Sequence, residues 1–415
     1  MDRRSFLAAL PLVPAAARSA SVRAFGARGD GHTDDSAAFQ AALDRSRSIW
    51  VPAGRYLVGE LAIWSHTRIQ GEGARSVLLH KKGSAVLASA QAGDGGSPDP
   101  RDNVRDIAIE DLAFEGRSVS EGFFETHHLL VVAGCSRLTV ARCRFSAFQG
   151  DAIILCSGYS GAVERHNEDI AIRHCLFDGV NFANRQAVSV VEGTRVAIER
   201  NRFQNCSRHD MPGAVDIELE LAHARIRDIR VAGNHFVNVL GGVGVVSVIL
   251  AIDRSDAPPH GIEIRGNRIE GRYKSPGIVA KAFVDGASAP PIGLVIAGNE
   301  ILDTHHGFEV SGLNGVRVED NLIRGTVVHA TLSTPHRGRA ANVTVTGNRF
   351  EKVGMHGPTA LKVHPTVGLV IARNRFVDCG WSQEPRAILD VSEEPAGEMR
   401  LESNDFAEPR RRSGA

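Results

Sequence analysis

The sequence has no excess of charge of either sign. Its 415 residues include 48 Lys plus Arg and 48 Asp plus Glu, so the formal net charge is +0 at pH 7. The longest run of basic residues is the tail Arg410–Arg412. Because binding to a phosphate backbone needs a concentrated positive surface, no nucleic-acid partner is predicted.

The apolar N-terminal stretch Phe6–Ala17 is too short to cross a bilayer as a mature helix, which takes about 20 residues. Asp2-Arg3-Arg4-Ser5-Phe6-Leu7 resembles the twin-arginine export consensus, and small residues follow the apolar stretch, as at a cleavage site. We therefore expect residues 1–20 to be a twin-arginine signal peptide. The mature protein would then be periplasmic or secreted, without a stable membrane span.

Cysteine is scarce. The six cysteines form no Cys-x-x-Cys motif, and no His-Glu-x-x-His motif occurs, so no metal site is predicted. Twin-arginine export moves folded proteins, so the thiols would stay reduced during folding. Cys143 and Cys175 occupy equivalent positions of successive repeats, about 4.8 Å apart if the repeats stack. Their side chains should run parallel, which favours buried thiols over a disulfide.

A short strand–turn–strand unit recurs along the chain and indicates the fold. Each copy has alternating apolar residues, two polar or small residues, a near-constant Asn, one variable residue, and Phe or Ile. The copies are RLTVARCRF (137–145), DIAIRHCLF (169–177), RVAIERNRF (195–203), DIRVAGNHF (228–236), GIEIRGNRI (261–269), GLVIAGNEI (293–301), GVRVEDNLI (315–323), NVTVTGNRF (342–350), GLVIARNRF (368–376), EMRLESNDF (398–406) and a degenerate DIAIEDLAF (106–114).

The turn position of these units predicts one β-helix coil for each copy. Its occupants are Leu112, Cys143, Cys175, Asn201, Asn234, Asn267, Asn299, Asn321, Asn348, Asn374 and Asn404, spaced by 22 to 33 residues. Asn tolerates the left-handed backbone conformation and suits such a turn. We therefore expect an all-β, right-handed parallel β-helix of about eleven or more coils, with an Asn ladder and stacked apolar columns. Leucine-rich repeats need more leucine than these units contain.

The N-terminal segment supports the same fold through a resemblance. Residues 22–43, VRAFGARGDGHTDDSAAFQAAL, followed by WVPAGRYLV (50–58), resemble the opening of the pectate-lyase-like β-helix superfamily. The resemblance implies a strand, a turn, a short helix with Thr33 or Asp34 as N-cap, and a second strand. Asp34 and Asp35 look like a catalytic pair, but acidic residues also favour a helix start, and we expect that structural role.

The domain organisation follows from these patterns. Residues 1–20 are the expected signal peptide, and 21–60 an N-terminal cap whose helix closes the core. The parallel β-helix spans 61–409, and 410–415 are a basic tail. In the resembled superfamily, the substrate groove lies along one sheet face. Here the strands that would line it are GDAIIL (150–155), QAVSVV (186–191), GAVDIELE (213–220), GIVAKAF (277–283), HGFEVSG (306–312) and ALKVH (360–364).

GAVDIELE places three carboxylates on one strand face. With Val215 and Ile217 inward, alternation turns Asp216, Glu218 and Glu220 outward. We expect Asp216 and Glu218 on the floor of an open groove. The preceding loop would bring His209 and Asp210 to its rim as further catalytic groups. Substrate-binding candidates on the same face and loop are Asp151, Arg208, Lys281 and Glu309.

A uronate reaction makes other demands. It needs a cation beside the substrate carboxylate and a base of suitable pKa, and the candidates are His209, Arg208, Arg185, Lys281 and Tyr273. The paired Asp of polygalacturonases is absent, since Ala152 follows Gly150-Asp151, and so is the Asp-Pro-His triplet of alginate epimerases. Carboxylate oxygens suit calcium, but no cofactor is predicted.

Three functions therefore remain open from the sequence. The first is a lyase or epimerase acting on an acidic polysaccharide. The second is a glycoside hydrolase that uses a carboxylate pair, and the third is a non-catalytic glycan-binding or envelope scaffold protein. In each case the expected partner is a polysaccharide or oligosaccharide. The sequence indicates no oligomeric state.

Overall fold

The structure is a computed structural model that describes residues 19–81, 86–89, 104–160, 163–219, 221–333, 338–381, 384–391 and 397–407. The signal-peptide prediction for residues 1–20 lies outside these ranges except for residues 19 and 20, and the basic-tail prediction for 410–415 lies wholly outside them. In the described part of the chain, no helix is long and apolar enough to cross a membrane.

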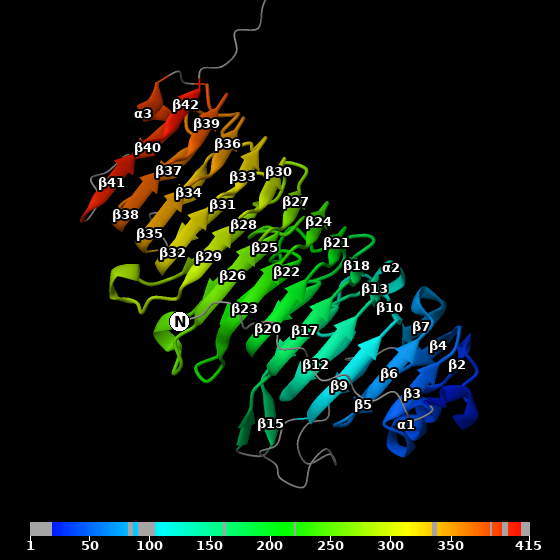
Figure 1. Cartoon of the computed structure of the whole chain (residues 1–415). Helices are drawn as coiled ribbons and strands as arrows, with labels where there is room; N and C mark the ends of the chain where they lie inside the picture. Colours follow the sequence, from blue (N-terminus) through cyan, green and yellow to red (C-terminus); the bar gives the residue numbers. More distant parts are fainter. Residues whose placement is uncertain are drawn as a thin grey trace, which may run out of the picture.

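Three parallel sheets run the length of an elongated molecule, and the chain visits them in turn (Figure 1). The architecture is a parallel β-solenoid of the right-handed type with about twelve turns. We name the sheets by their place relative to the repeated turn: sheet A precedes it, sheet B follows it, and sheet C returns the chain to the next coil. The parallel β-helix prediction is thereby confirmed, with short helices as additions.

Sheet A contains β1 (Ala20–Ser21), β3 (Ser48–Val51), β6 (Arg68–Gly71), β9 (Val104–Glu110), β12 (Cys135–Ala141), β17 (Glu168–Arg173), β20 (Gly193–Glu199), β23 (Ile226–Ala232), β26 (His260–Arg265), β29 (Leu294–Ala297), β32 (Asn314–Glu319), β35 (Ala341–Thr346), β38 (Val367–Ala372) and β41 (Met399–Glu402).

Sheet B contains β2 (Asp30–Asp34), β4 (Gly54–Val58), β7 (Ser76–His80), β10 (Ala113–Glu115), β13 (Arg144–Ser146), β18 (Leu176–Asp178), β21 (Arg202–Gln204), β24 (His235–Val237), β27 (Arg268–Glu270), β30 (Glu300–Leu302), β33 (Leu322–Arg324), β36 (Arg349–Glu351), β39 (Arg375–Val377) and β42 (Asp405–Ala407).

Sheet C contains β5 (Leu61–Ile63), β8 (Leu87–Ser89), β11 (Leu130–Ala133), β14 (Ile153–Cys156), β19 (Val188–Val190), β22 (Val215–Leu219), β25 (Val246–Leu250), β28 (Ile278–Ala282), β31 (Phe308–Ser311), β34 (Ala330–Leu332), β37 (Leu361–Val363) and β40 (Leu389–Val391). Outside the three sheets lie α1 (Ser36–Arg45), α2 (Ser118–Glu121), α3 (Pro385–Ile388) and an antiparallel hairpin of β15 (Gly158–Ser160) and β16 (Val163–Arg165).

The core consists of columns of identical or similar side chains. In sheet B, where consecutive repeats close with Phe, each ring stacks on the Phe of the next coil. Ring centroids from Phe114 through Phe145, Phe177 and Phe203 to Phe236 are 4.8, 5.0, 4.8 and 4.7 Å apart. These separations match the spacing of neighbouring strands. One coil cannot bury its own apolar face, so each is stabilised by the coils beside it.

The asparagine column forms the expected ladder. Asn299 Nδ2 donates to Asn321 Oδ1 at 2.9 Å and to the Ile264 carbonyl at 2.9 Å. Its Oδ1 accepts from both the backbone N–H and Nδ2 of Asn267, at 2.9 and 3.0 Å. The same pattern runs from Asn201 to Asn404. The ladder thus satisfies the turn amides that the solenoid buries.

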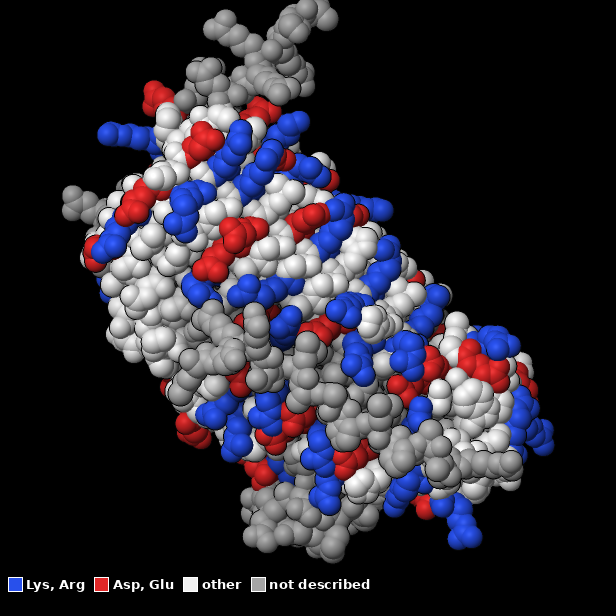
Figure 2. Space-filling view, in the orientation of Figure 1, with Lys and Arg blue, Asp and Glu red and all other residues white. Residues whose placement is uncertain are grey.

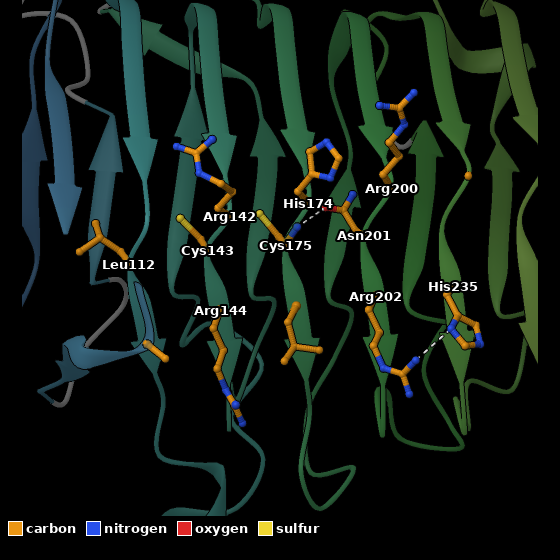
Figure 3. Close-up of a pocket in the computed structure, with 13 residues that line it drawn as sticks. Leu112, Arg142, Cys143, Arg144, His174, Cys175, Arg200, Asn201, Arg202 and His235 are labelled. Atoms are coloured by element: carbon orange, nitrogen blue, oxygen red, sulfur yellow. Dashed lines mark hydrogen bonds between the residues drawn. The ribbon is translucent and has the colours of Figure 1, made fainter. Parts of the chain in front are cut away.

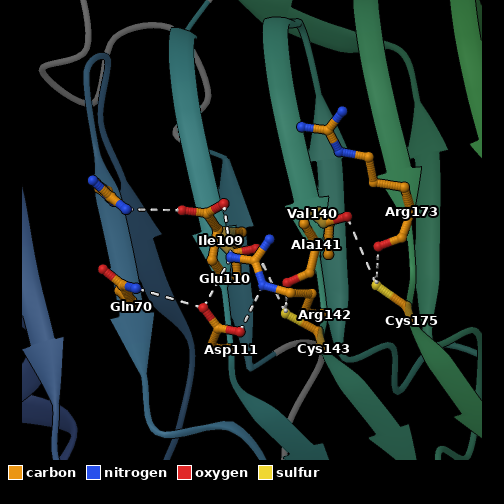
Figure 4. Close-up of polar contacts among 11 residues, drawn as sticks. Gln70, Ile109, Glu110, Asp111, Val140, Ala141, Arg142, Cys143, Arg173 and Cys175 are labelled. Carbon is orange, nitrogen blue, oxygen red and sulfur yellow. Dashed lines mark hydrogen bonds and ion pairs between the residues drawn. The ribbon is translucent and has the colours of Figure 1, made fainter. Parts of the chain in front are cut away.

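The left-handed residue of the turn is not the asparagine. It is the residue before it, as in Arg200 and Gly266, with φ of 54° and 60°. The predicted conformation of Asn is therefore wrong, and its role is hydrogen bonding. Two left-handed residues of opposite charge in adjacent coils, Asp111 and Arg142, are paired with each other. Arg142 Nε donates to Asp111 Oδ1 at 2.8 Å, and Arg142 also reaches Glu110 (Figure 4).

The cysteines are all free thiols. Cys143 and Cys175 lie side by side in the turn column, where each Sγ contacts backbone carbonyls (Figure 4). The buried-thiol prediction is therefore confirmed for this pair.

The N-terminal helix forms where the resemblance implies. α1 begins after Asp35, not at Thr33 or Asp34, and Asp35 accepts the Arg28 and Gly29 N–H groups at 2.7 and 3.0 Å. Asp34 binds Ser36 and Lys81, and these contacts lower the pKa of its carboxyl to about 2. The acidic residues thus hold the turn together. That α1 closes the end of the core remains a prediction.

Candidate functional site

The candidate site begins with β22 in sheet C. Val215, Ile217 and Leu219 face the core, so Asp216 and Glu218 share the opposite face, as predicted. The expected open groove floor is wrong for Asp216, which is 1% exposed, whereas Glu218 is half-buried. Period-two alternation assigns a side chain to a sheet face, but it does not show whether that face is open. Glu220 lies outside the described residues.

Asp216 belongs to a buried polar column. The parallel register aligns it with Ser189 of β19 and Ser247 of β25, and both serines are buried. Burial raises the pKa of Asp216 well above its usual range, and the neighbouring carboxyls of Glu218 and Asp151 raise it further. Its Oδ1 is buried and has no hydrogen-bond partner among the described residues. Burial and the adjacent carboxyls thus favour the protonated form of Asp216, and its side chain is hydrogen-bonded to Glu218.

Asp151 lies just before β14 and is fully buried, not on the outer strand face as predicted. Its Oδ1 accepts the Gln186 N–H at 3.1 Å and lies 3.8 Å from Arg185 Nε. Burial raises the pKa of Asp151 to about 6, although Arg185 and Gln186 act in the opposite direction. Arg185 also opposes the shift in Asp216. We call Asp151, Arg185, Asp216 and Glu218 the carboxyl cluster.

His128 adjoins the carboxyl cluster as a neutral ring. Its Nδ1 accepts the backbone N–H of Asp151 at 3.0 Å and lies 3.3 Å from Asp151 Oδ2. A ring nitrogen that accepts a hydrogen bond carries no proton, so the proton of His128 is on Nε2. Burial, with Arg185 nearby, lowers the pKa of His128 to about 4.

The 207–212 loop carries Arg208, His209 and Asp210, whose roles at the site stay predictions. Arg208 binds Asp210 through two hydrogen bonds of 2.9 and 2.7 Å, and its guanidinium lies 4.2 Å from the Phe123 ring centroid. The Arg208 pair lowers the pKa of Asp210, which therefore stays ionised and cannot act as an acid near neutral pH. His209 is exposed on the same loop.

Lys281 and Glu309 lie farther along sheet C. The register runs from Glu218 through Ile249 to Lys281, two coils on, which corresponds to about 10 Å at the usual strand spacing. Glu309 is three coils from Asp216, or about 14 Å, and pairs with His306 Nε2 at 3.9 Å. The structure therefore brings together Asp151, Asp216 and Glu218 and leaves these two residues outside the carboxyl cluster.

The loop between β10 and β11 adds groups that the sequence did not single out. Arg185 Nη1 lies 3.7 Å from Glu125 Oε1. Phe124 is 50% exposed and stacks on His127 with centroids 3.8 Å apart. The available signal was the length of this insertion, which is rich in aromatic and titratable residues. It follows no repeat, so pattern matching gave it no position.

Two hollows lie away from the carboxyl cluster. One, of ≈ 660 Å³, runs along the repeated turn, where Leu112, Cys143, Cys175 and Asn201 form a row between Arg142 and Arg202 (Figure 3). It is a shallow trough over the ladder, without a carboxyl among its lining residues. The other, of ≈ 370 Å³, lies beside the β15–β16 hairpin. Positive and negative side chains are interspersed over the visible face of the molecule (Figure 2).

Comparisons with known proteins agree with the fold. Residues 19–211 match the family model "Rhamnogalacturonase A/epimerase, pectate lyase-like". The pre-neck appendage protein of Bacillus phage phi29 is 22% identical over 385 residues, which cover 79% of this chain and 40% of the phage protein. The chain thus spans well under two thirds of the curated relatives that it matches.

Solved structures of the same architecture come from enzymes and phage proteins. The A-module of the Azotobacter vinelandii mannuronan C-5 epimerase AlgE6 superimposes with a TM-score of 0.61 at 15% identity, covering 94% of this chain and 100% of that one. The N-terminal fragment of phi29 gene product 12 gives 0.70 at 16%, covering 92% and 66%. The tailspike of E. coli bacteriophage HK620, in complex with a hexasaccharide, gives 0.57 at 15%, covering 89% and 67%.

Proposed function

We propose that this chain, a member of the pectate-lyase-like parallel β-helix superfamily, is an exported protein that hydrolyses a polysaccharide at the carboxyl cluster of sheet C. The observation that carries the proposal is the state of Asp216. It is a buried acid on the same strand face as Glu218, and its pKa is raised by burial, Glu218 and Asp151. Glycoside hydrolysis uses carboxyl groups whose environments push their pKa values apart.

The roles follow from exposure. Glu218 is the half-buried member of the pair, so it meets the sugar and delivers a proton to the glycosidic oxygen. Asp216, beneath it, holds the proton and passes it to Glu218. Asp151, with a pKa of about 6, supplies the second carboxylate. It is buried in the free protein, so it takes a proton from the attacking water once that water reaches its Oδ2. The exposed ring of Phe124 provides an apolar face for a sugar ring.

A uronate lyase or epimerase is the second candidate, favoured by Arg185. Its Nε makes no hydrogen bond among the described residues, and its side chain is partly exposed. A guanidinium in that position can neutralise the carboxylate of a uronate, which such reactions require. His209, Arg208 and Lys281 remain candidates for contacts with a longer acidic chain.

A glycan panel tests the proposal. The protein lacking residues 1–20 is incubated with neutral and acidic polysaccharides, and both reducing ends and absorbance near 235 nm are followed. Hydrolysis releases reducing ends without the absorbance of unsaturated uronates, whereas a lyase produces both. Binding without either signal would contradict hydrolysis and would be consistent with an epimerase or with the non-catalytic alternative.

Variants then locate the reaction. Glu218→Gln and Asp216→Asn should each lower kcat by about 100-fold or more, the scale for loss of a positioned acid or base. The matched control is Glu263→Gln, which removes a carboxylate of β26 in sheet A. Full activity in both sheet C variants would overturn this site.

A further inference from the structure

The smaller hollow lies at the opposite end of the sheet C strands from Asp151, where the chain turns towards sheet A. Its volume is ≈ 370 Å³. The β16 strand, the first residues of β17 and β20, and the segment leading into β23 surround it. The lining residues are Glu164, Arg165, His166, Asn167, Glu168, Thr194, Arg195, Arg225 and Arg227.

A buried carboxyl makes the back of this hollow rigid. Glu192 is fully buried, and its two oxygens bind His166 Nδ1 at 3.1 Å and the Asn167 N–H at 2.6 Å. Asn167 is also fully buried, with its Nδ2 on the Cys156 carbonyl at 2.9 Å and its Oδ1 on the Cys135 N–H at 3.0 Å. Glu192 therefore fixes the ring of His166 so that Nε2 points away from the core.

The acidic residues at the rim lie against basic side chains. Glu164 Oε1 lies 3.0 Å from His223 Nε2, and Glu168 is bound by Arg195. Arg195 also binds Asp169 at 2.6 Å, so its charge is compensated. The remaining basic side chains of the hollow, Arg225 and Arg227, lie on its other side.

Arg225 and Arg227 form no ion pair within the described part of the chain, although Arg225 opposes the rise that burial causes in the pKa of Glu192. Arg227 Nε is in addition buried without a hydrogen-bond partner in the described part of the chain. A buried donor that is left unpaired costs free energy, and an oxyanion in the hollow would remove that cost. Thr194, which the register places opposite Arg227, adds a hydroxyl at the same point.

We propose that this hollow is a binding site for a single oxyanion, a carboxylate or phosphate group, held by Arg225, Arg227 and Thr194 against the wall of His166. The guanidinium groups supply charge-assisted hydrogen bonds, which suit both anions. The site is separate from the carboxyl cluster, so it does not depend on the proposed hydrolysis. On an acidic polysaccharide it would hold a charged group away from the reacting bond.

Calorimetric titration of the whole mature protein tests the site, with inorganic phosphate in one arm and galacturonate in the other. Binding in the first arm alone identifies a phosphate group as the ligand, and binding in the second alone identifies a carboxylate. Arg227→Gln should weaken the observed binding about tenfold or more, as expected for loss of a charge-assisted hydrogen bond. Arg225→Gln, at an exposed position, should also weaken anion binding. This second variant tests the site if Arg227→Gln unfolds the protein.

The matched control is Arg230→Gln, in the same strand, because Arg230 is bound to Glu199 at 2.8 Å. The Arg230→Gln variant should bind either anion with the affinity of the parent protein. The proposal is overturned if neither anion binds, or if Arg225→Gln and Arg230→Gln bind equally well. If the mature protein binds the anion but hydrolyses no glycan, the proposed hydrolysis at the carboxyl cluster is contradicted and the anion site is not.

Discussion

Asp151→Asn should make the protein more stable at neutral and alkaline pH. Asp151 is fully buried, and burial raises the pKa of its carboxyl from 3.8 to about 6. Between these two values the folded protein holds a proton that the unfolded chain has lost. The free energy of unfolding therefore falls as pH rises through this window and is constant above it. Each pKa unit corresponds to 1.36 kcal/mol, so the penalty is about 3 kcal/mol.

The variant removes this penalty because Asn resembles the protonated carboxyl and can still accept the Gln186 N–H. Urea unfolding at pH 4 and pH 8 measures it. The variant and the parent protein should be equally stable at pH 4, and the variant more stable by up to about 3 kcal/mol at pH 8. His128 contacts Asp151, but burial lowers its pKa to about 4, so it is neutral at pH 8, where the difference between the two proteins is measured.

Asp34→Asn provides a control of opposite sign. Hydrogen bonds from Lys81 and Ser36 lower the pKa of Asp34 to about 2. Its ionised form therefore stabilises the fold above the ordinary pKa, and this contribution is lost as pH falls through about 4 to 2. The Asp34 variant should be less stable than the parent at pH 8. An Asp151 variant that is no more stable than the parent at pH 8 would refute the burial argument.

Two further predictions concern the ladder and export. Asn299→Leu removes the acceptor of two buried donors of Asn267, each worth about 1–3 kcal/mol, so the urea midpoint should fall; an unchanged midpoint would mean that the ladder contributes little. Replacing Arg3 and Arg4 together with Lys should trap the unprocessed protein in the cytoplasm, and normal accumulation outside it would exclude twin-arginine transport.

The repeat could be predicted from the sequence because every coil of the solenoid is under the same physical constraints. Each coil must bury one apolar face and satisfy one turn, so the same residue types recur at the same offset. Even the degenerate copies with Leu112, Cys143 and Cys175 keep the register of the ladder, since the Cys175 N–H donates to Asn201 Oδ1 at 2.9 Å. The left-handed position was missed because Gly at 233, 266, 298 and 347 alternates there with charged residues, which hides the pattern.

The candidate site was predictable only in part. Alternation along β22 correctly placed Asp216 and Glu218 on one face of sheet C. It could not show that Asp216 is buried, because that depends on how segments of different coils pack. It also did not show that Asp210 is paired with Arg208, two residues earlier in the same loop. Arg185 and His128 approach Asp151 from turns that are far apart in the sequence, and no spacing rule connects them.

The loop that carries Arg185 gives an independent reason to regard this region as functional. Val180 and Phe182 have φ of 62° and 61°, and Val180 is the one β-branched residue with positive φ among the described residues. Such a conformation costs about 1–3 kcal/mol and persists only where the surroundings enforce it. Here Asp178 Oδ1 accepts the Val180 N–H at 3.0 Å, and the buried Asn184 accepts the Ser207 N–H at 2.7 Å.

These contacts hold the loop at both ends, so the strain is maintained by specific hydrogen bonds and not by the repeat. At the regular turns the left-handed position holds Gly, Asp, Arg, His or Ser, and none of these is β-branched. A β-branched residue kept in this conformation, five residues before Arg185, fixes the path of the backbone that delivers the guanidinium to Asp151. The strained loop thus preorganises the one cation of the carboxyl cluster before any substrate is bound.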